Sequence, residues 1–372
     1  MSMKVAVISV ADIRHMTPSS IYTRFFDDNE IDYNIICTKR YVDDSPEEDS
    51  RLIRYNWLTS PSRNRMKKLI PFLRYRRFVT KVLKEKRYDF LVIWNENTAT
   101  LLFDVLLWKF NGRYCVNVRD PVSDLGILSK ITMKVLNRSL YNTIPALPCF
   151  PGLENERFKY YSMINKDLKV IENCPKKETL KKPGETLVIT YMGSTVHIET
   201  WRKMIDVFSN DQRFELRFIG PECDTIIAAY AEENGVNNVV CRGHFHPEKT
   251  AEYLEETDII NYYYNHGIVN ALGIKASYGP QLRIVQICDP FIGWADVCMK
   301  YGFGFPVETV DNLPEALYAW YHSLDMEELK KGCDEYCRYV DEINQKFYDE
   351  CMSLFLVEKN ILSEIKSENY IH

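Results

Sequence analysis

An alternation of apolar, strand-like runs with helical patterns constrains the fold of this chain more than any other feature. The alternation occurs twice, and between the two series lies NCPKKETLKKPGE, which holds four lysines, two prolines and a glycine and has no apolar periodicity. Strands and helices that alternate in this way form right-handed βαβ units with a parallel sheet. We therefore predict an α/β chain of two Rossmann-like domains, each a doubly wound parallel sheet, that face each other across a cleft.

The length also supports two domains, because single hydrophobic cores rarely grow beyond about 250–300 residues and this chain has 372. We place the N-terminal domain at residues 1–173, the linker at 174–186 and the C-terminal domain at 187–340. Late in the second series, the pattern predicts a helix over 280–286 and a strand over 291–292.

The composition indicates a globular protein of a reducing compartment, with 46% hydrophobic and 27% charged residues. The apolar run in MSMKVAVISV is too short for a signal peptide, and no stretch approaches the ~20 apolar residues of a membrane-spanning helix. The eleven cysteines are an odd number, and several stand in strand-like runs, unlike a disulfide framework. We therefore predict a cytoplasmic protein.

Two short motifs contain residues that can bind metals. Cys333 and Cys337 are spaced i,i+4 in a helical pattern, and His244 and His246 form an HxH sequence. Neither pair has further cysteines or histidines at a matching spacing. We therefore predict structural, turn or capping roles for these residues and no metal site.

The second series offers a set of candidate ligand-binding residues. In open parallel sheets, ligands bind beyond the carboxyl ends of the strands, where loops present backbone N–H groups. A glycine there lets the backbone approach a ligand, and hydroxyls and a guanidinium suit a diphosphate. The residues that we predict at these strand ends are Gly193, Ser194, Thr195, Gly220, Arg242, Tyr278, Gly279 and Arg283.

Each of these predictions has a structural alternative. Gly193 can be an ordinary turn glycine, because no GxGxxG or Walker motif accompanies it. Arg283 falls in the first turn of the helix predicted from Pro280, where a cation opposes the helix dipole. That placement favours a ligand-binding role, but an exposed surface arginine is the alternative.

The first series ends its strands in groups that can titrate or carry charge. Asp120, Glu96 and His15 are candidates for a general base, and Asn95 and Arg119 stand on the same predicted edge. The same residue types form helix caps, turns and local ion pairs, so structural roles stay open for each.

A basic segment dominates the charge distribution of the chain. Residues 51–87 hold 13 Lys and Arg and one acid, a local charge of +12, so the rest of the chain sums to −17 when the whole carries −5. The cations alternate with aromatic and aliphatic residues, which suits an anionic membrane surface. The docking candidates are Lys67, Lys68, Arg74, Arg76 and Arg77. A solvated helix face and nucleic-acid binding are the alternatives.

Several runs of the second series together resemble a known family. VITYMGS, FELRFIG and VVCRGHFHPEKTAEYLEETDII are similar to the opening strands and turns of the donor domain in GT-B glycosyltransferases. The resemblance points in particular to bacterial polysaccharide-biosynthesis enzymes of glycosyltransferase group 1, or family 4, related to glycogen and sucrose synthases. SYGPQLRIVQICDPFI stands where those enzymes have a donor helix, but the family's paired glutamates are absent.

The resemblance implies a hexosyltransferase that moves a sugar from a UDP- or GDP-sugar to a glycan or lipid-linked acceptor in cell-surface polysaccharide assembly. It implies a donor site in the C-terminal domain, no cofactor and no metal. It also implies a terminal helix, residues 341–372, that returns to the N-terminal domain. With the basic segment, it suggests peripheral docking on the inner face of the cell membrane. Two alternatives stay open: a nucleotide-sugar epimerase on the same fold, and a non-catalytic subunit that binds a nucleotide sugar or glycan.

Overall fold

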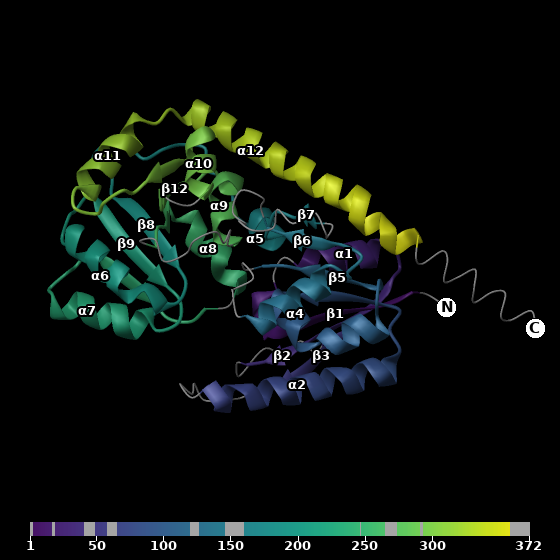
Figure 1. Cartoon of the computed structure of the whole chain (residues 1–372). Helices are drawn as coiled ribbons and strands as arrows, with labels where there is room; N and C mark the ends of the chain where they lie inside the picture. Colours follow the sequence, from purple (N-terminus) through teal and green to yellow (C-terminus); the bar gives the residue numbers. More distant parts are fainter. Residues whose placement is uncertain are drawn as a thin grey trace, which may run out of the picture. The chain divides into compact units, whose positions relative to one another are not determined.

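The computed structural model describes residues 3–16, 19–40, 49–57, 65–119, 126–145, 160–245, 247–264, 274–290 and 293–357. The chain divides into two compact units (Figure 1), one made of Met1–Ile164 with Ile343–His372 and the other of Asn165–Glu342. Each unit is built on one parallel sheet. The predicted α/β class with two Rossmann-like sheets is therefore confirmed.

The first unit contains a seven-stranded sheet in the order β3-β2-β1-β4-β5-β6-β7. Val, Ile and Leu fill its central strands, which are buried on both faces, as parallel sheets require. The two edge strands β3 and β7, which the sequence did not predict, are short and only partly buried. The strands are β1 (Lys4–Asp12), β2 (Asp32–Lys39), β3 (Leu52–Asn56), β4 (Phe90–Trp94), β5 (Tyr114–Asn117), β6 (Asn142–Ile144) and β7 (Tyr160–Ser162).

Helices cover both faces of this sheet. On one face, Tyr75, Val79 and Leu102 pack into an apolar cluster with the strands, and on the other, Phe26 and Met352 do the same. The helical elements are η1 (Ile13–His15), α1 (Ser20–Asp28), α2 (Arg65–Lys86), α3 (Glu96–Leu101), η3 (Val105–Lys109), α4 (Ile127–Leu136) and η8 (Tyr348–Met352).

The second unit contains a six-stranded parallel sheet in the order β10-β9-β8-β11-β12-β13. The strands are β8 (Leu187–Met192), β9 (Phe214–Ile219), β10 (Val239–Arg242), β11 (Ile259–Tyr262), β12 (Val285–Cys288) and β13 (Gly304–Pro306). The helical elements are α5 (Leu168–Asn173), η5 (Thr195–His197), α6 (Ile198–Val207), η6 (Cys223–Ile227), α7 (Ala228–Glu233), η7 (Pro247–Lys249), α8 (Thr250–Glu255), α9 (Ile274–Leu282), α10 (Gly293–Lys300), α11 (Leu313–Ser323) and α12 (Met326–Phe347).

The helix predicted over 280–286 is wrong. Pro280 stands inside α9, which ends at Leu282, and Val285–Cys288 is strand β12. Arg283 ends the helix in the left-handed conformation, with φ of 57°. The residue that takes this conformation after a helix is usually a glycine. Because an arginine takes it here, the sequence carried no sign that the helix ends at this point. The strand predicted over 291–292 lies outside the described residues.

The division of the chain differs from the predicted boundary after Asn173. Residues 165–186 belong to the second unit, because α5 packs there: Val170 and Cys174 lie in one apolar cluster with Leu254 and Tyr278. The chain leaves the second unit within α12, and residues 343–357 belong to the first unit, where Phe347 joins the core.

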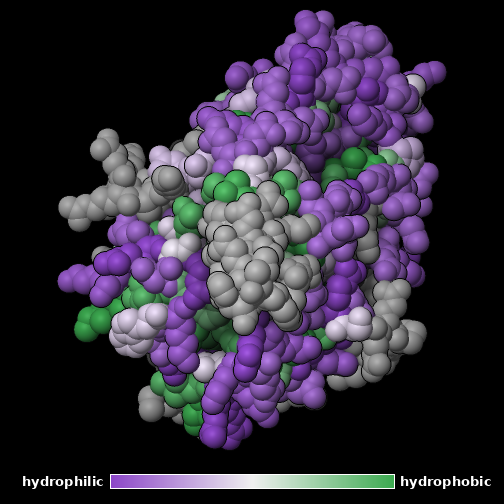
Figure 2. Space-filling view, turned by 90° about the vertical axis from the view of Figure 1, so that its right-hand side faces the viewer, coloured by the Kyte–Doolittle hydropathy of each residue, from purple (hydrophilic) through white to green (hydrophobic). Residues whose placement is uncertain are grey.

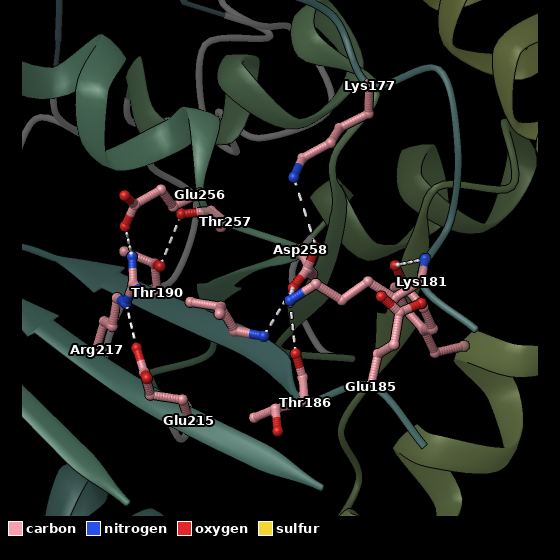
Figure 3. A network of polar contacts seen from close by, with 12 residues as sticks. Lys177, Lys181, Glu185, Thr186, Thr190, Glu215, Arg217, Glu256, Thr257 and Asp258 are labelled. Atoms are coloured by element: carbon pink, nitrogen blue, oxygen red, sulfur yellow. Dashed lines mark hydrogen bonds and ion pairs between the residues drawn. The ribbon is translucent and has the colours of Figure 1, made fainter. Parts of the chain in front are cut away.

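The lysine-rich linker is tied to the second sheet by a buried carboxylate (Figure 3). Asp258, whose side chain is 4% exposed, pairs with Lys177 Nζ at 3.5 Å and Lys181 Nζ at 2.7 Å. Its Oδ2 also accepts a hydrogen bond from the Val188 backbone N–H at 2.9 Å. The linker lysines therefore neutralise a charge that precedes β11 at the amino edge of the sheet.

Replacing Asp258 by alanine should lower the free energy of unfolding by roughly 2–3 kcal/mol, because it leaves a buried N–H and two lysines without their shared partner. Asp206→Ala is the matched control: Asp206 accepts a hydrogen bond from the Tyr230 hydroxyl at an exposed position, so its loss should cost about 0.5 kcal/mol or less. Urea unfolding followed by tryptophan fluorescence measures both. Equal losses in the two variants would contradict the role given to Asp258.

Candidate functional site

The strand order places one candidate site in each sheet. In both sheets, the order reverses beside the first strand, between β1 and β4 and between β8 and β11. Helices that leave neighbouring strands on opposite faces open a crevice at such a point, beyond the carboxyl ends of the strands. The residues that follow β8 and β11 in the second unit, and β1 and β4 in the first, therefore line the two candidate sites.

Two glycines hold the strand ends of the second unit close together. A methyl group on Gly220 would lie 2.0 Å from the Gly193 carbonyl oxygen, so no side chain fits there. The Gly193 N–H donates to the Ile219 carbonyl at 2.8 Å and the Gly220 N–H to the Arg242 carbonyl at 3.0 Å. The hydrogen-bond ladder of the sheet thus continues past the ends of β8 and β9. It holds the glycine backbone in place, and the absence of side chains lets a ligand come close to it.

The residues after Gly193 shape the loop. Ser194 is exposed and stands before η5, and its carbonyl accepts a hydrogen bond from the Tyr191 hydroxyl at 2.9 Å. The Thr195 hydroxyl donates to Glu222 Oε2 at 3.0 Å. Ser194 therefore keeps its hydroxyl available at the edge, whereas that of Thr195 is used to join the two loops.

The structure adds a cation that the sequence analysis missed, Lys275 in the first turn of α9. Its Nζ would lie 2.6 Å from a methyl group on Gly193, and it stands over the Tyr191 ring at 5.4 Å from the centroid. Within the described residues, Lys275 has no carboxylate partner. An ammonium group without a counter-charge therefore faces the glycine loop at the point of strand-order reversal.

The electrostatic surroundings of Lys275 identify it as an unusual lysine. Desolvation by burial lowers its pKa to about 8, and the nearby Cys223 thiol opposes that shift only in part. Burial raises the pKa of Cys223 to about 12, and that of Tyr191 is raised as well. Near neutral pH the thiol and the phenol are therefore uncharged, and Lys275 is a cation that an anionic ligand would stabilise.

Aromatic side chains pack against one another beside the glycine loop. The rings of Tyr191 and Trp201 lie 4.1 Å apart between centroids, and that of Tyr264 lies 5.9 Å from Trp201. The backbone N–H of Tyr264 donates to the buried Asp289 carboxylate at 2.7 Å, which joins the ends of β11 and β12. These contacts give the site a rigid base.

Of the three other residues predicted for this site, one lies at the same edge of the sheet and two lie within a helix. Arg242 ends the edge strand β10 and is exposed. Tyr278 and Gly279 stand inside α9 and not in a loop. The Tyr278 hydroxyl donates to Asp167 at 3.1 Å, and a methyl group on Gly279 would meet the Gln286 side chain at 1.9 Å. Tyr278 and Gly279 therefore serve helix packing.

The placement predicted for Arg283 is also wrong. It follows α9 and precedes β12, so it lies at the amino edge of the sheet, opposite the glycine loop. Its guanidinium pairs with Glu178 at 2.6 Å and with Asp334 at 3.2 Å. These contacts tie α12 and the linker to α9, a structural role.

In the first unit, His15 lies just after β1, on η1. Burial lowers its pKa below 6.5, as do the nearby Arg40 and Arg14 guanidinium groups, whereas the Asp12 carboxylate raises it. Asp12 itself accepts hydrogen bonds from the backbone N–H groups of Arg14 at 3.1 Å and Arg40 at 2.9 Å. His15 is therefore a neutral imidazole at pH 7, able to accept a proton.

Glu96 and Arg119 come together at the ends of β4 and β5. Glu96 is buried, and its Oε2 accepts a hydrogen bond from the Arg119 backbone N–H at 3.3 Å while Asn97 donates to Oε1 at 2.8 Å. The Arg119 guanidinium stacks on the Trp94 ring at 4.4 Å from its centroid. The hydrogen bond from Arg119 and the stacking on Trp94 join the two strand ends, whereas the bond from Asn97 lies within α3.

Asn95 has the structural role of a helix cap: its Oδ1 accepts from the Thr98 backbone N–H at 2.8 Å, and its φ is 74°. The third candidate base, Asp120, lies outside the described residues.

The membrane-docking candidates are all residues of α2. Arg74 and Arg77 are exposed, and Arg76 pairs with Asp104 on the neighbouring helical segment. Lys67 and Lys68 belong to the first turn of α2, and their side chains are outside the described part. No helix in the described ranges is long and apolar enough to cross a membrane.

No cluster of three or more His, Cys, Asp or Glu side chains in the described part of the chain could hold a metal ion. Cys333 is fully buried, and the Cys337 thiol lies 3.5 Å from the Pro280 carbonyl oxygen. Both cysteines therefore contribute to packing around α9 and α12.

Comparison with solved structures identifies chains of the same fold. No family model and no curated protein matches the sequence. The sucrose-phosphate synthase of Thermosynechococcus elongatus matches with a TM-score of 0.68 at 13% identity, over 95% of this chain and 100% of that one. The Anabaena protein HepE, in complex with UDP and glucose, matches with a TM-score of 0.67 at 10% identity, over 94% of this chain and 100% of that one.

A Listeria monocytogenes protein described as a UDP-N-acetylglucosamine 2-epimerase is also similar, with a TM-score of 0.57 at 8% identity, over 90% of this chain and 91% of that one. The first two structures are GT-B glycosyltransferases, so the predicted resemblance to the GT-B fold is confirmed. At these identities the comparison establishes the fold, and the chemistry must be argued from the residues of this chain.

Gly220→Ala should destabilise the second unit by roughly 3 kcal/mol, because the added methyl group would overlap the Gly193 carbonyl oxygen. Gly235→Ala is a suitable control: its φ is +63° and no atom lies within 4 Å of the added methyl group, so it should cost about 1–2 kcal/mol. Urea unfolding curves of the two variants give the comparison. If Gly220→Ala lowers the free energy of unfolding no more than Gly235→Ala does, the close approach of the two loops does not stabilise the second unit.

Proposed function

We propose that this protein is a glycosyltransferase that moves a sugar from a UDP- or GDP-sugar to a glycan or lipid-linked saccharide in cell-surface polysaccharide assembly. One observation carries the proposal: the loop Gly193–Thr195, Gly220 and the uncompensated ammonium of Lys275 meet where the strand order of the second sheet reverses. The fold shared with HepE, which holds UDP and glucose, supports the same assignment.

The cradle has the properties that a diphosphate requires. Glycine lets the backbone approach the phosphate oxygens, the Ser194 hydroxyl can donate to them, and Lys275 supplies a positive charge in a partly desolvated position. A lysine that is half-buried without a counter-ion destabilises the free protein, and a bound anion would remove that cost. The same charge would stabilise the nucleoside diphosphate as it leaves, so the transfer would need no metal ion and no further cofactor.

The reaction would proceed by transfer of the glycosyl group. The acceptor hydroxyl oxygen forms a bond to the anomeric carbon, and the bond from that carbon to the diphosphate oxygen breaks. The electron pair stays with the diphosphate, and the hydroxyl proton passes to a base. The first unit would supply the acceptor side and that base.

His15 is the best supported base among the three candidates. It lies beside the point of strand-order reversal in the first sheet, and its lowered pKa keeps it neutral at pH 7. Both oxygens of Glu96 already accept hydrogen bonds, one from the neighbouring Asn97 and one from the Arg119 N–H after β5, which favours a positioning role for Glu96. For the acceptor, we propose only a class, a glycan or a lipid-linked saccharide. Peripheral contact with an anionic membrane would bring the enzyme to a lipid-linked saccharide.

A nucleotide-sugar epimerase is the second candidate, favoured by the similarity to the Listeria protein. An epimerase would change the stereochemistry of free UDP-sugar without an acceptor. A binding subunit without catalysis would hold the nucleotide sugar unchanged. Incubation with each UDP- and GDP-sugar, followed by analysis of nucleotide and sugar products, separates the three: released UDP or GDP supports the transferase, an epimeric nucleotide sugar the epimerase, and an intact donor the binding subunit.

Lys275→Ala should weaken UDP binding roughly 10- to 100-fold at pH 7, the range expected for loss of a charged hydrogen bond. Wild-type affinity should fall as the pH rises through about 8, because Lys275 loses its proton while the diphosphate of UDP is already fully ionised. Lys275→Arg should retain binding and remove this pH dependence. Isothermal titration calorimetry with UDP between pH 6.5 and 9.5 tests all three expectations.

Two variants serve as controls for the lysine. Lys203→Ala removes an exposed cation of α6, and Arg283→Ala removes the cation at the opposite edge of the sheet. Both should leave UDP affinity within about twofold, since neither group reaches the glycine loop. If Lys275→Ala binds UDP as the wild type does while Arg283→Ala does not, the site is wrongly placed.

His15→Gln should lower the turnover of the donor by roughly 10²–10⁴-fold, the usual contribution of a general base, and leave UDP affinity unchanged. Wild-type turnover should persist at pH 6.5 and decrease only at lower pH, as the pH falls through the lowered pKa of His15 and the imidazole gains a proton. Nucleotide release, assayed between pH 5 and 8, measures this. Loss of turnover in Glu96→Gln with normal turnover in His15→Gln would transfer the role to Glu96.

A further inference from the structure

One side of α2 carries a pattern that the fold does not require. Tyr75, Val79 and Leu83 bury the opposite side of the helix, and the Tyr75 hydroxyl donates to the Ser9 carbonyl at 2.5 Å. The outward side begins with exposed aliphatic residues, Leu69 at 49% and Leu73 at 52% exposure. Residues at i, i+3 and i+4 share a helix side, so the cations that follow Leu73 at these spacings extend the same stripe.

This stripe forms one wall of a groove of about 710 Å³. The wall consists of Leu73, Arg76, Arg77, Thr80, Lys81 and Lys84. The facing wall belongs to the segment around η3 and includes Val105, Trp108 and Lys109. Trp108 is 77% exposed, which is unusual for a tryptophan because its large apolar ring is normally buried.

The groove holds more positive charge than its own acids neutralise. Arg76 pairs with Asp104, and Lys81 lies 3.8 Å from Glu85. Within the described residues, Arg77, Lys84 and Lys109 have no carboxylate partner. Cations gathered in a groove repel one another and are favoured only when an anion is present.

We propose that the groove between α2 and η3 binds the phosphate of an anionic phospholipid and so attaches the first unit to a membrane surface. Arg77, Lys84 and Lys109 would neutralise the phosphate, and Trp108 would enter the interfacial region, where its amphipathic ring is stable. Leu69 and Leu73, farther along the same side of α2, would contact the acyl boundary. The cations of the groove thus match a lipid head group, and its exposed apolar side chains match the acyl layer beside it.

The surroundings favour a lipid over nucleic acid. Exposed aliphatic side chains continue the cationic stripe, and the rest of the chain outside residues 51–87 is acidic, at −17, which would repel a long polyanion. On the face shown in Figure 2, hydrophobic side chains form small separate patches in a mostly hydrophilic surface.

The groove is separate from the proposed chemistry. Because α2 precedes the buried strand β4, its C-terminal half, with Lys81 and Lys84, lies toward the amino edge of the sheet. The candidate base and the strand ends lie at the carboxyl edge. The groove therefore anchors the unit and does not hold the reacting saccharide, and the proposal stands whether or not the protein transfers sugars.

Flotation with phospholipid vesicles tests the groove in the full-length protein. Wild-type protein should float with vesicles that contain 30 mol% phosphatidylglycerol and not with pure phosphatidylcholine vesicles. Arg77→Ala/Lys84→Ala should weaken this binding at least tenfold, since each cation near the surface contributes a factor of about five. The control Lys130→Ala/Lys134→Ala removes two exposed cations from α4 with the same change in net charge, and should bind within about twofold of the wild type.

Quenching of tryptophan fluorescence by lipids brominated on their acyl chains locates the contact. The other five tryptophans are buried or partly buried, so Trp108 should account for most of the quenching, and Trp108→Phe should lose it while still floating. Equal binding of the groove and α4 variants, binding to phosphatidylcholine alone, or preferential binding of RNA would each overturn the proposal. Unchanged UDP titration in the groove variant shows that it is folded and separates this result from the donor site.

Discussion

Parallel pairing of β8 with both β9 and β11 is the constraint on which the second unit depends. It places a strand end on each side of Gly193 and fixes all of these ends at one edge of the sheet. The pairing is close enough that Gly220 admits no side chain. The same packing that stabilises the sheet therefore brings the hydrogen-bonded glycine backbone and the Lys275 ammonium together at the edge where open parallel sheets bind their ligands.

Lys275 shows how the site depends on tertiary structure. A lysine at the start of a helix is unfavourable for the helix dipole, and here it is also desolvated enough to lower its pKa to about 8. The first sheet has the same strand-order reversal but places a neutral imidazole there, His15, and a hydrogen-bonded carboxylate, Glu96. The strand-order reversal therefore carries a cation in the second sheet and a neutral proton acceptor in the first.

The long strands, their order of appearance and the glycines that follow them were predictable, because buried parallel strands read as continuous Val and Ile runs. The predicted helix and anion site were wrong because two residues occupy backbone positions that other residue types usually occupy. Arg283 adopts the left-handed conformation of a terminal glycine and Pro280 stands inside α9. Together they displaced the predicted helix by between one and two turns, and with it the predicted anion site. Lys275 could not be found from spacing, since its proximity to Gly193 depends on where α9 begins.

Charge is the remaining feature that packing leaves unexplained. The aromatic side of α2 is sufficient to hold that helix on the sheet: Tyr75 and Val79 are fully buried, and Tyr55 and Trp57 pack against Tyr75. Neutral polar residues on the outward side would serve the fold equally well and would avoid repulsion among the cations. Exposed Trp108 likewise adds nothing to the core. Cations and an exposed indole that face the same groove therefore indicate a surface shaped by a binding partner, and an anionic, partly apolar partner satisfies both.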